Sequence, residues 1–169
     1  MNLKIVVLDV DGTMTDGGIY LDNKRVETKK FSIKDGAGIL LAQQMGLEFM
    51  ILTGRRSHCV QQRANELKVK YVIQEVHNKK AYLEQFMERN SLSKDELAYV
   101  GDDLNDLPAM KIVGYCACPF DAAPEVKNYC AIVLSKKGGE GAVREFVEIL
   151  LKNRNQWDAA IENLFALKL

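Results

Sequence analysis

The segment Ile5-Val6-Val7-Leu8-Asp9-Val10-Asp11-Gly12-Thr13 decides the fold of this chain. Its first four residues are apolar and rich in β-branched side chains, a pattern typical of a strand buried on both faces. Ligands of open α/β sheets bind just beyond the carboxyl ends of the strands, where Asp9 and Asp11 lie. Gly12 allows the backbone to turn there. Two neighbouring carboxylates are costly unless a cation shares their site. Taken alone, a short D-x-D motif favours a solvated strand-to-loop junction, so the evidence for a functional site has to come from the rest of the chain.

The composition favours one ordinary globular domain that spans residues 1–169. Apolar residues make up 47% of the chain and charged residues 27%, and the 23 basic residues balance 23 acidic ones. This balance gives no broad basic field for nucleic acid or an anionic membrane. No apolar run approaches the roughly 20 residues of a membrane span, and the N-terminus shows no signal-peptide layout. We therefore expect a cytoplasmic protein without nucleic-acid or membrane partners.

The four cysteines do not form a metal-binding pattern. There is no C-x-x-C pair and no histidine at ligand spacing, so a zinc site is not expected. Cys116 and Cys118 share one face of an expected strand, which favours small buried hydrophobic side chains in a reducing compartment.

Strands and helices alternate along the rest of the chain. Strands are expected at 49–52, 71–73, 97–100, 115–118 and 131–134, and helices at 37–44, 57–68, 78–88 and 142–152, with helical turns after Pro108 and at 124–128. Asp35-Gly36 is expected to open the first helix, and Gly46 to close it. This alternation predicts a Rossmann-like, three-layer α/β/α fold around a parallel sheet.

Two segments lie outside this alternation. Residues 17–31 read as a polar β-hairpin inserted after the first strand, which suggests a flap over the site or an assembly surface. No large cap domain is present. The tail, about 154–169, has apolar residues at helical spacing, so we expect an amphipathic helix that packs on its own body or on a neighbour. These residues are Trp157, Ile161, Leu164, Phe165 and Leu167.

Polar residues follow three of the buried strands. Thr53-Gly54-Arg55-Arg56 follows the strand at 49–52, and the acidic segment 101–106 follows the strand at 97–100. Lys79 stands in the first turn of a helix, where its positive charge opposes the helix dipole. An unfavourable placement of this kind close to a candidate site points to a functional role for the lysine. Carboxylates are ligands for Mg²⁺, and a carboxylate can attack phosphorus. The strand ends together indicate phosphoryl transfer.

The chain carries four motifs in this order: D-x-D-G-T, T-G-R, a helix-opening Lys and G-D-D-x-x-D. Together they resemble the motifs of the haloacid dehalogenase superfamily of aspartate-dependent phosphatases. The resemblance implies a phosphatase that uses Mg²⁺. Asp9 would be the nucleophile and a metal ligand. Asp11 would be the general acid and base, with its main-chain carbonyl on the metal. Asp102 would be the second carboxylate ligand.

The same resemblance assigns the remaining site residues. Thr53 and the amide of Gly54 would hold the phosphoryl group, and Lys79 would balance its charge. Asp106 would support the metal shell through water or Lys79. Asp103 would either stand in that outer shell or orient Lys79.

A finer resemblance covers nearly the whole chain. The short hairpin, F-S-I-K-D-G (31–36), T-G-R-R (53–56) and G-G-E-G-A-V-R-E (138–145) are similar to the 3-deoxy-D-manno-octulosonate 8-phosphate phosphatases of lipopolysaccharide biosynthesis. The resemblance implies a cap-less homotetramer in which hairpins meet centrally and a neighbouring subunit covers each active site. Arg55, and more weakly Lys34, would bind the carboxylate of the phosphorylated sugar acid.

Two positions depart from this family's pattern: Thr13 stands where an aliphatic residue is common, and Asn78 where an Asp precedes the lysine. A sister phosphatase for a nine-carbon sugar acid 9-phosphate is therefore an alternative, although Arg55 favours the eight-carbon substrate. A receiver domain fits poorly because its acid pair and phosphoacceptor lie on different strands. A non-catalytic assembly module would lack the nucleophile or metal acids, which are present here.

Overall fold

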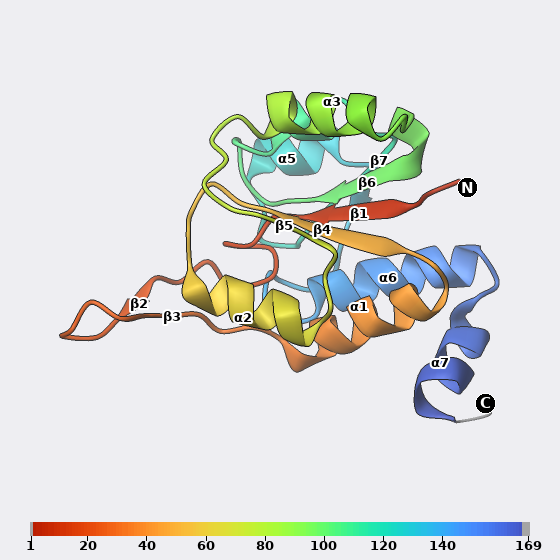
Figure 1. Ribbon diagram of the computed structural model, residues 1–169, viewed down its shortest axis with the longest axis horizontal. Helices are drawn as coiled ribbons and strands as arrows, with labels where there is room; N and C mark the ends of the chain where they lie inside the picture. The colour runs from red at the N-terminus through yellow and green to blue at the C-terminus, as the bar shows by residue number, and fades with distance from the viewer. Residues whose placement is uncertain (1, 167–169) are drawn as a thin grey trace.

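A six-stranded parallel sheet forms the centre of the computed structural model, which describes residues 2–166 (Figure 1). Its strands are β1 (Ile5–Leu8), β4 (Glu48–Leu52), β5 (Tyr71–Ile73), β6 (Leu97–Val100), β7 (Tyr115–Cys118) and β8 (Ile132–Val133). Their order is β5-β4-β1-β6-β7-β8, and each pair of neighbours runs parallel. The strand of the opening segment is therefore central, with three strands to one side and two to the other.

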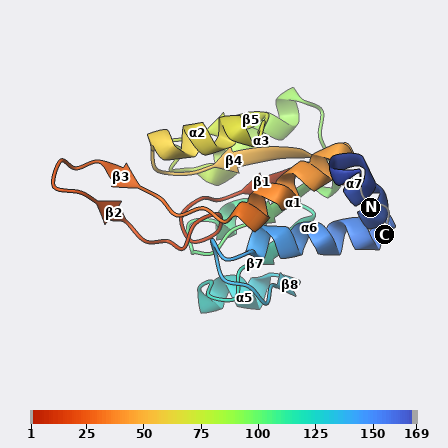
Figure 2. The ribbon, with the colours of Figure 1, turned by 90° about the horizontal axis from the view of Figure 1, so that it is seen from below.

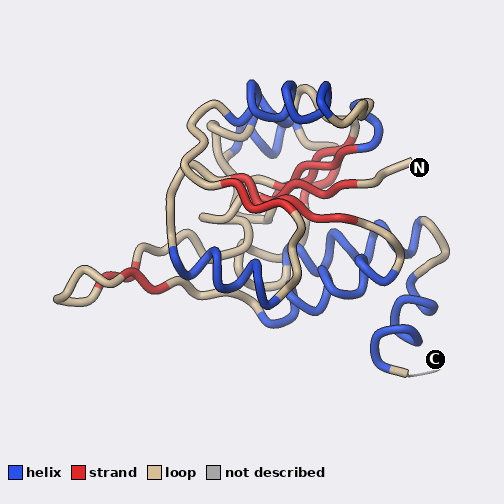
Figure 3. Tube along the Cα trace, viewed as in Figure 1, coloured by secondary structure: helices blue, strands red, loops and turns tan. Residues whose placement is uncertain are grey.

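Helices cover both faces of the sheet and confirm the expected three-layer fold (Figure 3). One layer holds α3 (Lys79–Arg89), α4 (Leu107–Met110) and α5 (Pro124–Tyr129); the other holds α1 (Ile33–Gln44), α2 (His58–Glu66) and α6 (Ala142–Asn153). A short 3₁₀ turn, η1 (Lys94–Glu96), leads into β6. The helix α7 (Trp157–Phe165) packs against α1 and α6.

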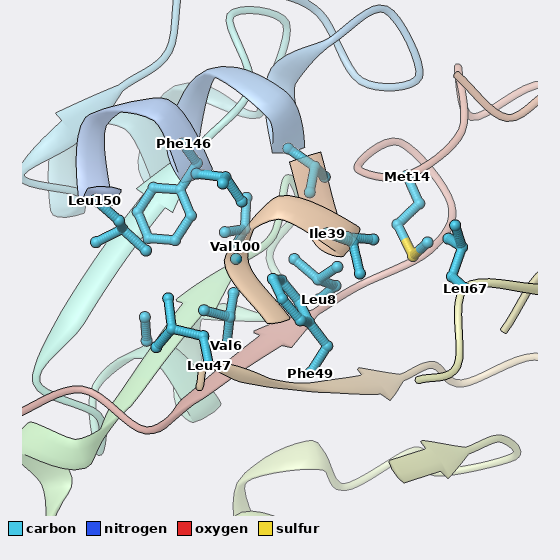
Figure 4. Packing of buried hydrophobic residues seen from close by; sticks show 14 of the residues in the cluster. Val6, Leu8, Met14, Ile39, Leu47, Phe49, Leu67, Val100, Phe146 and Leu150 are labelled. Carbon is cyan, nitrogen blue, oxygen red and sulfur yellow. The ribbon is translucent and has the colours of Figure 1, made fainter. Parts of the chain in front are cut away.

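The central strand β1 is buried on both faces because each face carries apolar side chains. Val6 and Leu8 face the α1 and α6 layer, where Phe146 of α6 and Ile39 of α1 pack near them (Figure 4). Ile5 and Val7 belong to the second core cluster, on the α3 side. Two-sided burial of this kind is typical of parallel sheets covered by helices. It fixes β1 in place and, with it, the two acids at its end.

The first helix begins earlier in the chain than expected. It begins at Ile33 rather than after Asp35-Gly36, because the Ser32 side chain accepts a hydrogen bond from the Asp35 amide at 3.3 Å and so caps the helix. The Asp35 carboxylate serves a different helix: it accepts from the backbone amide of Arg144 at 2.8 Å, in the first turn of α6. Asp35 thus joins two helices of one layer.

The inserted hairpin is present and extends past the end of the sheet where the strands finish (Figures 1 and 2). Its strands, β2 (Tyr20–Leu21) and β3 (Glu27–Thr28), are shorter than expected. Apolar side chains lie exposed on it, with Ile19, Leu21 and Val26 each more than half exposed. The hairpin does not contribute these side chains to the core.

The tail forms α7, with Ile161 buried and Trp157 and Leu164 packed against the core, so it packs on its own body. Leu167 lies outside the described residues. Cys116 and Cys118 lie in the same core cluster, as their shared strand face predicts. Among residues 2–166, no helix has the length and apolar character needed to span a membrane.

Candidate active site

A cavity of about 200 Å³ lies at the carboxyl ends of β1, β4 and β6. It is lined by Asp9, Asp11, Thr53, Gly54, Arg55, Asp102, Asp103 and Asn105. These residues come from three segments far apart in the chain, which the parallel sheet brings to one edge. Larger hollows exist elsewhere on the surface, but this one combines convergent carboxylates with a strand-end threonine, and its chemistry marks it as the site.

Three carboxylates meet beside this cavity. Asp9, Asp102 and Asp106 each offer an oxygen, and these oxygens all lie within 4.8 Å of one another. Lys79 Nζ lies 2.5 Å from Asp9 Oδ1 and 2.7 Å from Asp106 Oδ1, with only 2% of the lysine side chain exposed. One ammonium group therefore contacts two of these three acids, which leaves the cluster short of positive charge.

Burial and crowding change the acidity of two of these groups. Burial, followed by the charge of Asp106, raises the pKa of Asp9 to about 7, although Lys79 opposes the rise. Burial and the charges of Asp9 and Asp106 raise the pKa of Asp102 to about 8. Deprotonated together, these carboxylates need a further cation, and clustered carboxylate oxygens suit a hard divalent ion such as Mg²⁺. The residues present fit such an ion.

Asp106 is held by donors on both of its oxygens. Oδ1 accepts from Lys79 and from the Tyr99 hydroxyl at 2.7 Å, while Oδ2 accepts from the amides of Asp102 at 3.0 Å and Asp103 at 3.3 Å. Asp106 therefore orders the acidic loop and the lysine. Tyr99 is a site residue that sequence reasoning missed. The available signal was a tyrosine in a fully buried strand, because a buried hydroxyl usually has a partner.

Thr13 was also missed as a contributor. Its hydroxyl is buried and donates to Asp102 Oδ1 at 3.1 Å, so the residue that departs from the family pattern helps orient a candidate metal ligand. Gly12 has a φ of +90°, and a Cβ there would lie 2.0 Å from Asp102 Oδ2. Only glycine fits at this turn.

Asp11 takes part in a second charged group, on the hairpin side of the cavity. Its Oδ1 contacts the ammonium of Lys29, and its Oδ2 lies 3.8 Å from Arg55 Nε. Glu27 Oε1 accepts from Arg55 Nη2 at 2.7 Å and lies 3.4 Å from Lys29 Nζ. Neither Lys29 nor Glu27 was expected at the site, because the contacts of these hairpin residues with Asp11 and Arg55 depend on how the hairpin folds back.

The other candidate residues take different positions. Thr53 is buried at the end of β4, and its hydroxyl oxygen accepts from the amide of Arg55 at 3.4 Å. Asp103 is exposed, and its carboxylate accepts from the amide of Leu104 at 2.8 Å rather than from Lys79. Lys34 is not brought to this cavity: it lines a separate hollow of about 530 Å³ beside α6.

Known proteins are similar to this chain over most of its length. Residues 71–146 match the family of haloacid dehalogenase-like hydrolases. The 3-deoxy-D-manno-octulosonate 8-phosphate phosphatase of Escherichia coli K12 is 36% identical over 159 residues, which cover 94% of this chain and 85% of that protein.

Solved structures of such phosphatases are also similar. The enzyme from Moraxella catarrhalis, in complex with magnesium, phosphate and KDO, has a TM-score of 0.92 and 34% identity, covering 96% of this chain and 93% of its own. The cobalt-bound enzyme from Haemophilus influenzae has a TM-score of 0.88 and 32% identity, covering 94% and 92%. Together with the acidic cluster, these structures support a divalent metal at the site.

Proposed function

Because the chain belongs to the haloacid dehalogenase-like hydrolases, and among them to the family of 3-deoxy-D-manno-octulosonate 8-phosphate phosphatases, we propose that it hydrolyses that sugar acid phosphate to the free sugar acid and phosphate. Family membership makes the chain a phosphatase. The particular substrate, the use of Mg²⁺ and the residue roles below are our proposal. The observation that carries it is Asp9, which lies among Lys79, Asp102 and Asp106 and lines the cavity that also contains Thr53.

In the first step, a carboxylate oxygen of Asp9 attacks phosphorus and forms an aspartyl-phosphate. The bond from phosphorus to the sugar oxygen breaks, and the carboxyl group of Asp11 gives its proton to that oxygen. Thr53 and the amide of Gly54 hold the phosphoryl oxygens, while Lys79 balances their charge. Lys79 is suited to this because it already contacts Asp9 and is almost fully buried.

In the second step, the Asp11 carboxylate takes a proton from water, and the resulting hydroxide attacks phosphorus and releases phosphate. Asp9 then regains its carboxylate. Asp9, Asp102 and the main-chain carbonyl of Asp11 would hold Mg²⁺. Asp106 and the nearby Asp103 would support these ligands without binding the ion directly. The bound cation neutralises charge on the phosphoryl group, which is the main requirement of phosphoryl transfer.

Arg55 is the proposed recognition residue for the sugar acid carboxylate. Its side chain lines the cavity and is about half exposed (48%), so the guanidinium is available to a ligand. Glu27 orients it through the 2.7 Å contact. A planar guanidinium can bind a carboxylate through two parallel hydrogen bonds.

We further propose that residues 1–169 form one domain that works as a homotetramer in the cytoplasm. Exposed Ile19, Leu21 and Val26 suit the hairpin to assembly. Residues 2–166 place no cap domain above the catalytic cavity, so a neighbouring subunit would supply the cover that excludes water.

Phosphate release tests the proposal. The protein with Mg²⁺ is assayed against the eight-carbon and nine-carbon sugar acid phosphates and against hexose phosphates, with Asp9→Asn as the control. We expect a strong preference for the eight-carbon acid, abolished by Asp9→Asn. Arg55→Lys should weaken that preference, because an ammonium group cannot bind a carboxylate through two parallel hydrogen bonds.

Other outcomes decide between alternatives. Preference for the nine-carbon acid would keep the chemistry and overturn the substrate. Slow, equal turnover of all substrates would indicate a generalist phosphatase. Release no faster than that of Asp9→Asn would overturn the catalytic proposal.

A further inference from the structure

The hairpin carries a lysine whose side chain is buried. Lys29 directly follows β3, and only 1% of its side chain is exposed, whereas Val26 in the same hairpin is 58% exposed. Lysine is almost never fully buried unless it is paired, because removing an ammonium group from water is costly. The position of Lys29 therefore depends on specific anionic partners.

Those partners are the carboxylates of Asp11 and Glu27. The Lys29 ammonium contacts Asp11 Oδ1 and lies 3.4 Å from Glu27 Oε1. Residues 27 and 29 lie two apart on extended backbone, so their side chains share a face. Cys59 of α2 donates through its thiol to the Glu27 carbonyl at 3.3 Å, which ties this part of the hairpin to the body. The lysine is thus held in place from the same chain.

The two carboxylate oxygens of Asp11 have different partners. Lys29 donates to Oδ1, whereas Oδ2 lies 3.8 Å from Arg55 Nε, beyond hydrogen-bond distance. An ammonium group has only donors, so the acidic proton of Asp11 cannot sit between Lys29 and Oδ1. It must sit on Oδ2. That oxygen faces Arg55, which lines the catalytic cavity.

We propose that Lys29 is a positioning residue for Asp11. By occupying Oδ1, Lys29 presents Oδ2 to the substrate. The proton leaves from Oδ2 when the phosphorus–oxygen bond to the sugar breaks, and the proton of the attacking water returns there. Lys29 keeps its own protons throughout. This inference rests on the proposed function, in which Asp11 is the general acid and base, and adds a hairpin residue that acts through it.

The choice of substrate separates this role from a general structural one. A sugar phosphate has a poor leaving group that needs a proton, whereas an activated aryl phosphate such as p-nitrophenyl phosphate leaves without one. General acid catalysis contributes roughly 10²- to 10⁴-fold, and a misplaced acid forfeits part of that factor. We therefore expect Lys29→Met to lower kcat/KM for the sugar acid phosphate by about 30-fold or more, and for the aryl phosphate by about threefold at most.

Two further variants sharpen the test. Lys24→Met, at the exposed tip of the same hairpin, should leave both values unchanged. Lys29→Arg, which keeps a cationic donor, should recover part of the loss.

A second readout follows the covalent intermediate. With the aryl phosphate, Lys29→Met should accumulate aspartyl-phosphate after acid quenching, measured by intact mass, because Asp11 is misplaced for activating water. Equal losses on both substrates, a raised KM with an unchanged kcat, or no loss at all would each overturn the proposal. Wild-type protein inactive on both substrates would instead overturn the proposed function, so the two failures are distinguishable.

Discussion

Lys79 and Asp9 are 70 residues apart in the chain, yet Lys79 Nζ and Asp9 Oδ1 lie 2.5 Å apart in the site. The same ammonium contacts Asp106, so a single cation links the end of β1 to the loop after β6. Its place in the first turn of α3, unfavourable to the helix dipole, is explained by these two carboxylates. The unfavourable placement of Lys79 in its own helix therefore permits an ion-pair contact between two strand ends of the sheet.

Lys79→Met should abolish most of the activity and destabilise the fold. Removing the lysine leaves two buried carboxylates without their cation, and breaking a buried ion pair in this way costs about 3–5 kcal/mol. Thermal unfolding and phosphate release measure the two effects. Lys80→Met is the matched control, because Lys80 is exposed and pairs with the exposed Glu84 at 3.5 Å. Equal behaviour of the two variants would contradict this prediction.

Tyr99→Phe should lower activity while keeping the fold. The hydroxyl donates to Asp106 Oδ1 at 2.7 Å inside the core, and its loss leaves a buried carboxylate with one donor fewer. We expect a loss of about 1–3 kcal/mol in unfolding free energy, measured by urea denaturation, and a fall in kcat. Tyr82→Phe is the control, because the half-buried Tyr82 of α3 stacks on Phe86 and does not contact the acids of the site. A Tyr99→Phe protein as active and stable as the wild type would show that Asp106 does not need this donor.

The centre of the sheet could be predicted because β1, β4 and β6 are short apolar runs, each followed by a polar residue or a glycine. Gly12, Gly54 and Gly101 mark three of these ends, and the strand-end rule then brings Asp9, Thr53 and Asp102 to one edge. Family resemblance added the chemical roles. Both arguments use local pattern plus one general rule of topology.

The contacts made by Lys29, Tyr99 and Thr13 could not be predicted in the same way. Each depends on which way a side chain turns in the folded protein, and the local pattern around each residue has a simpler explanation. Lys29 stands in a hairpin that reads as polar and exposed, yet its own side chain is buried. The start of α1 was misplaced for a related reason, because Asp35 caps α6 across the layer rather than opening its own helix.

Mg²⁺ should stabilise the protein more at high pH than at low pH. The folded-state pKa values of Asp9 and Asp102, about 7 and 8, lie above the ordinary value of 3.8. A raised carboxyl pKa contributes stability that is complete below the unfolded value and is lost as pH rises through the folded one. Metal-free protein should therefore lose stability between about pH 4 and pH 8, as the carboxylates ionise and repel one another.

The measurement is the melting temperature with Mg²⁺ or with a chelator. We expect the Mg²⁺-induced rise in Tm to be larger at pH 8.5 than at pH 6 by about 3 °C or more. Asp102→Asn, which removes one charge from the cluster, should flatten this difference. An equal rise at both pH values would contradict the placement of the cation among these acids.

Thr13→Val should raise the Mg²⁺ concentration needed for half-maximal activity by several-fold. The Thr13 hydroxyl stabilises the charged form of Asp102, and its contribution lowers the pKa of that carboxyl, which burial otherwise raises. Without it, Asp102 holds its proton more firmly and competes less well for the cation. Thr13→Ser keeps the donor and should behave like the wild type. An unchanged Mg²⁺ requirement in Thr13→Val would assign the threonine to packing alone.

Gly138→Ala should disturb the catalytic loop from a distance in sequence. A Cβ at Gly138 would lie 1.8 Å from the Gly12 carbonyl oxygen, and the adjacent Gly139 amide donates to the Thr13 carbonyl at 3.1 Å. The clashing oxygen belongs to the backbone, so rotation of a side chain cannot relieve the clash. We expect a loss of about 1–3 kcal/mol in stability, together with a fall in kcat because the displaced turn carries Asp11.

Gly46→Ala distinguishes this clash from ordinary backbone strain. Gly46 has a φ of +79°, but no atom lies within 4 Å of the place that a Cβ would take, so alanine there is strained without colliding. It should cost about 1 kcal/mol in stability and leave kcat unchanged, because it lies at the opposite end of α1 from the hairpin. If both variants lose stability and neither loses activity, the loop at Gly138 supports the fold but not the position of Asp11. A selective loss of kcat in Gly138→Ala would show that the close contact between these two glycine loops sets the geometry of the acid at the end of β1.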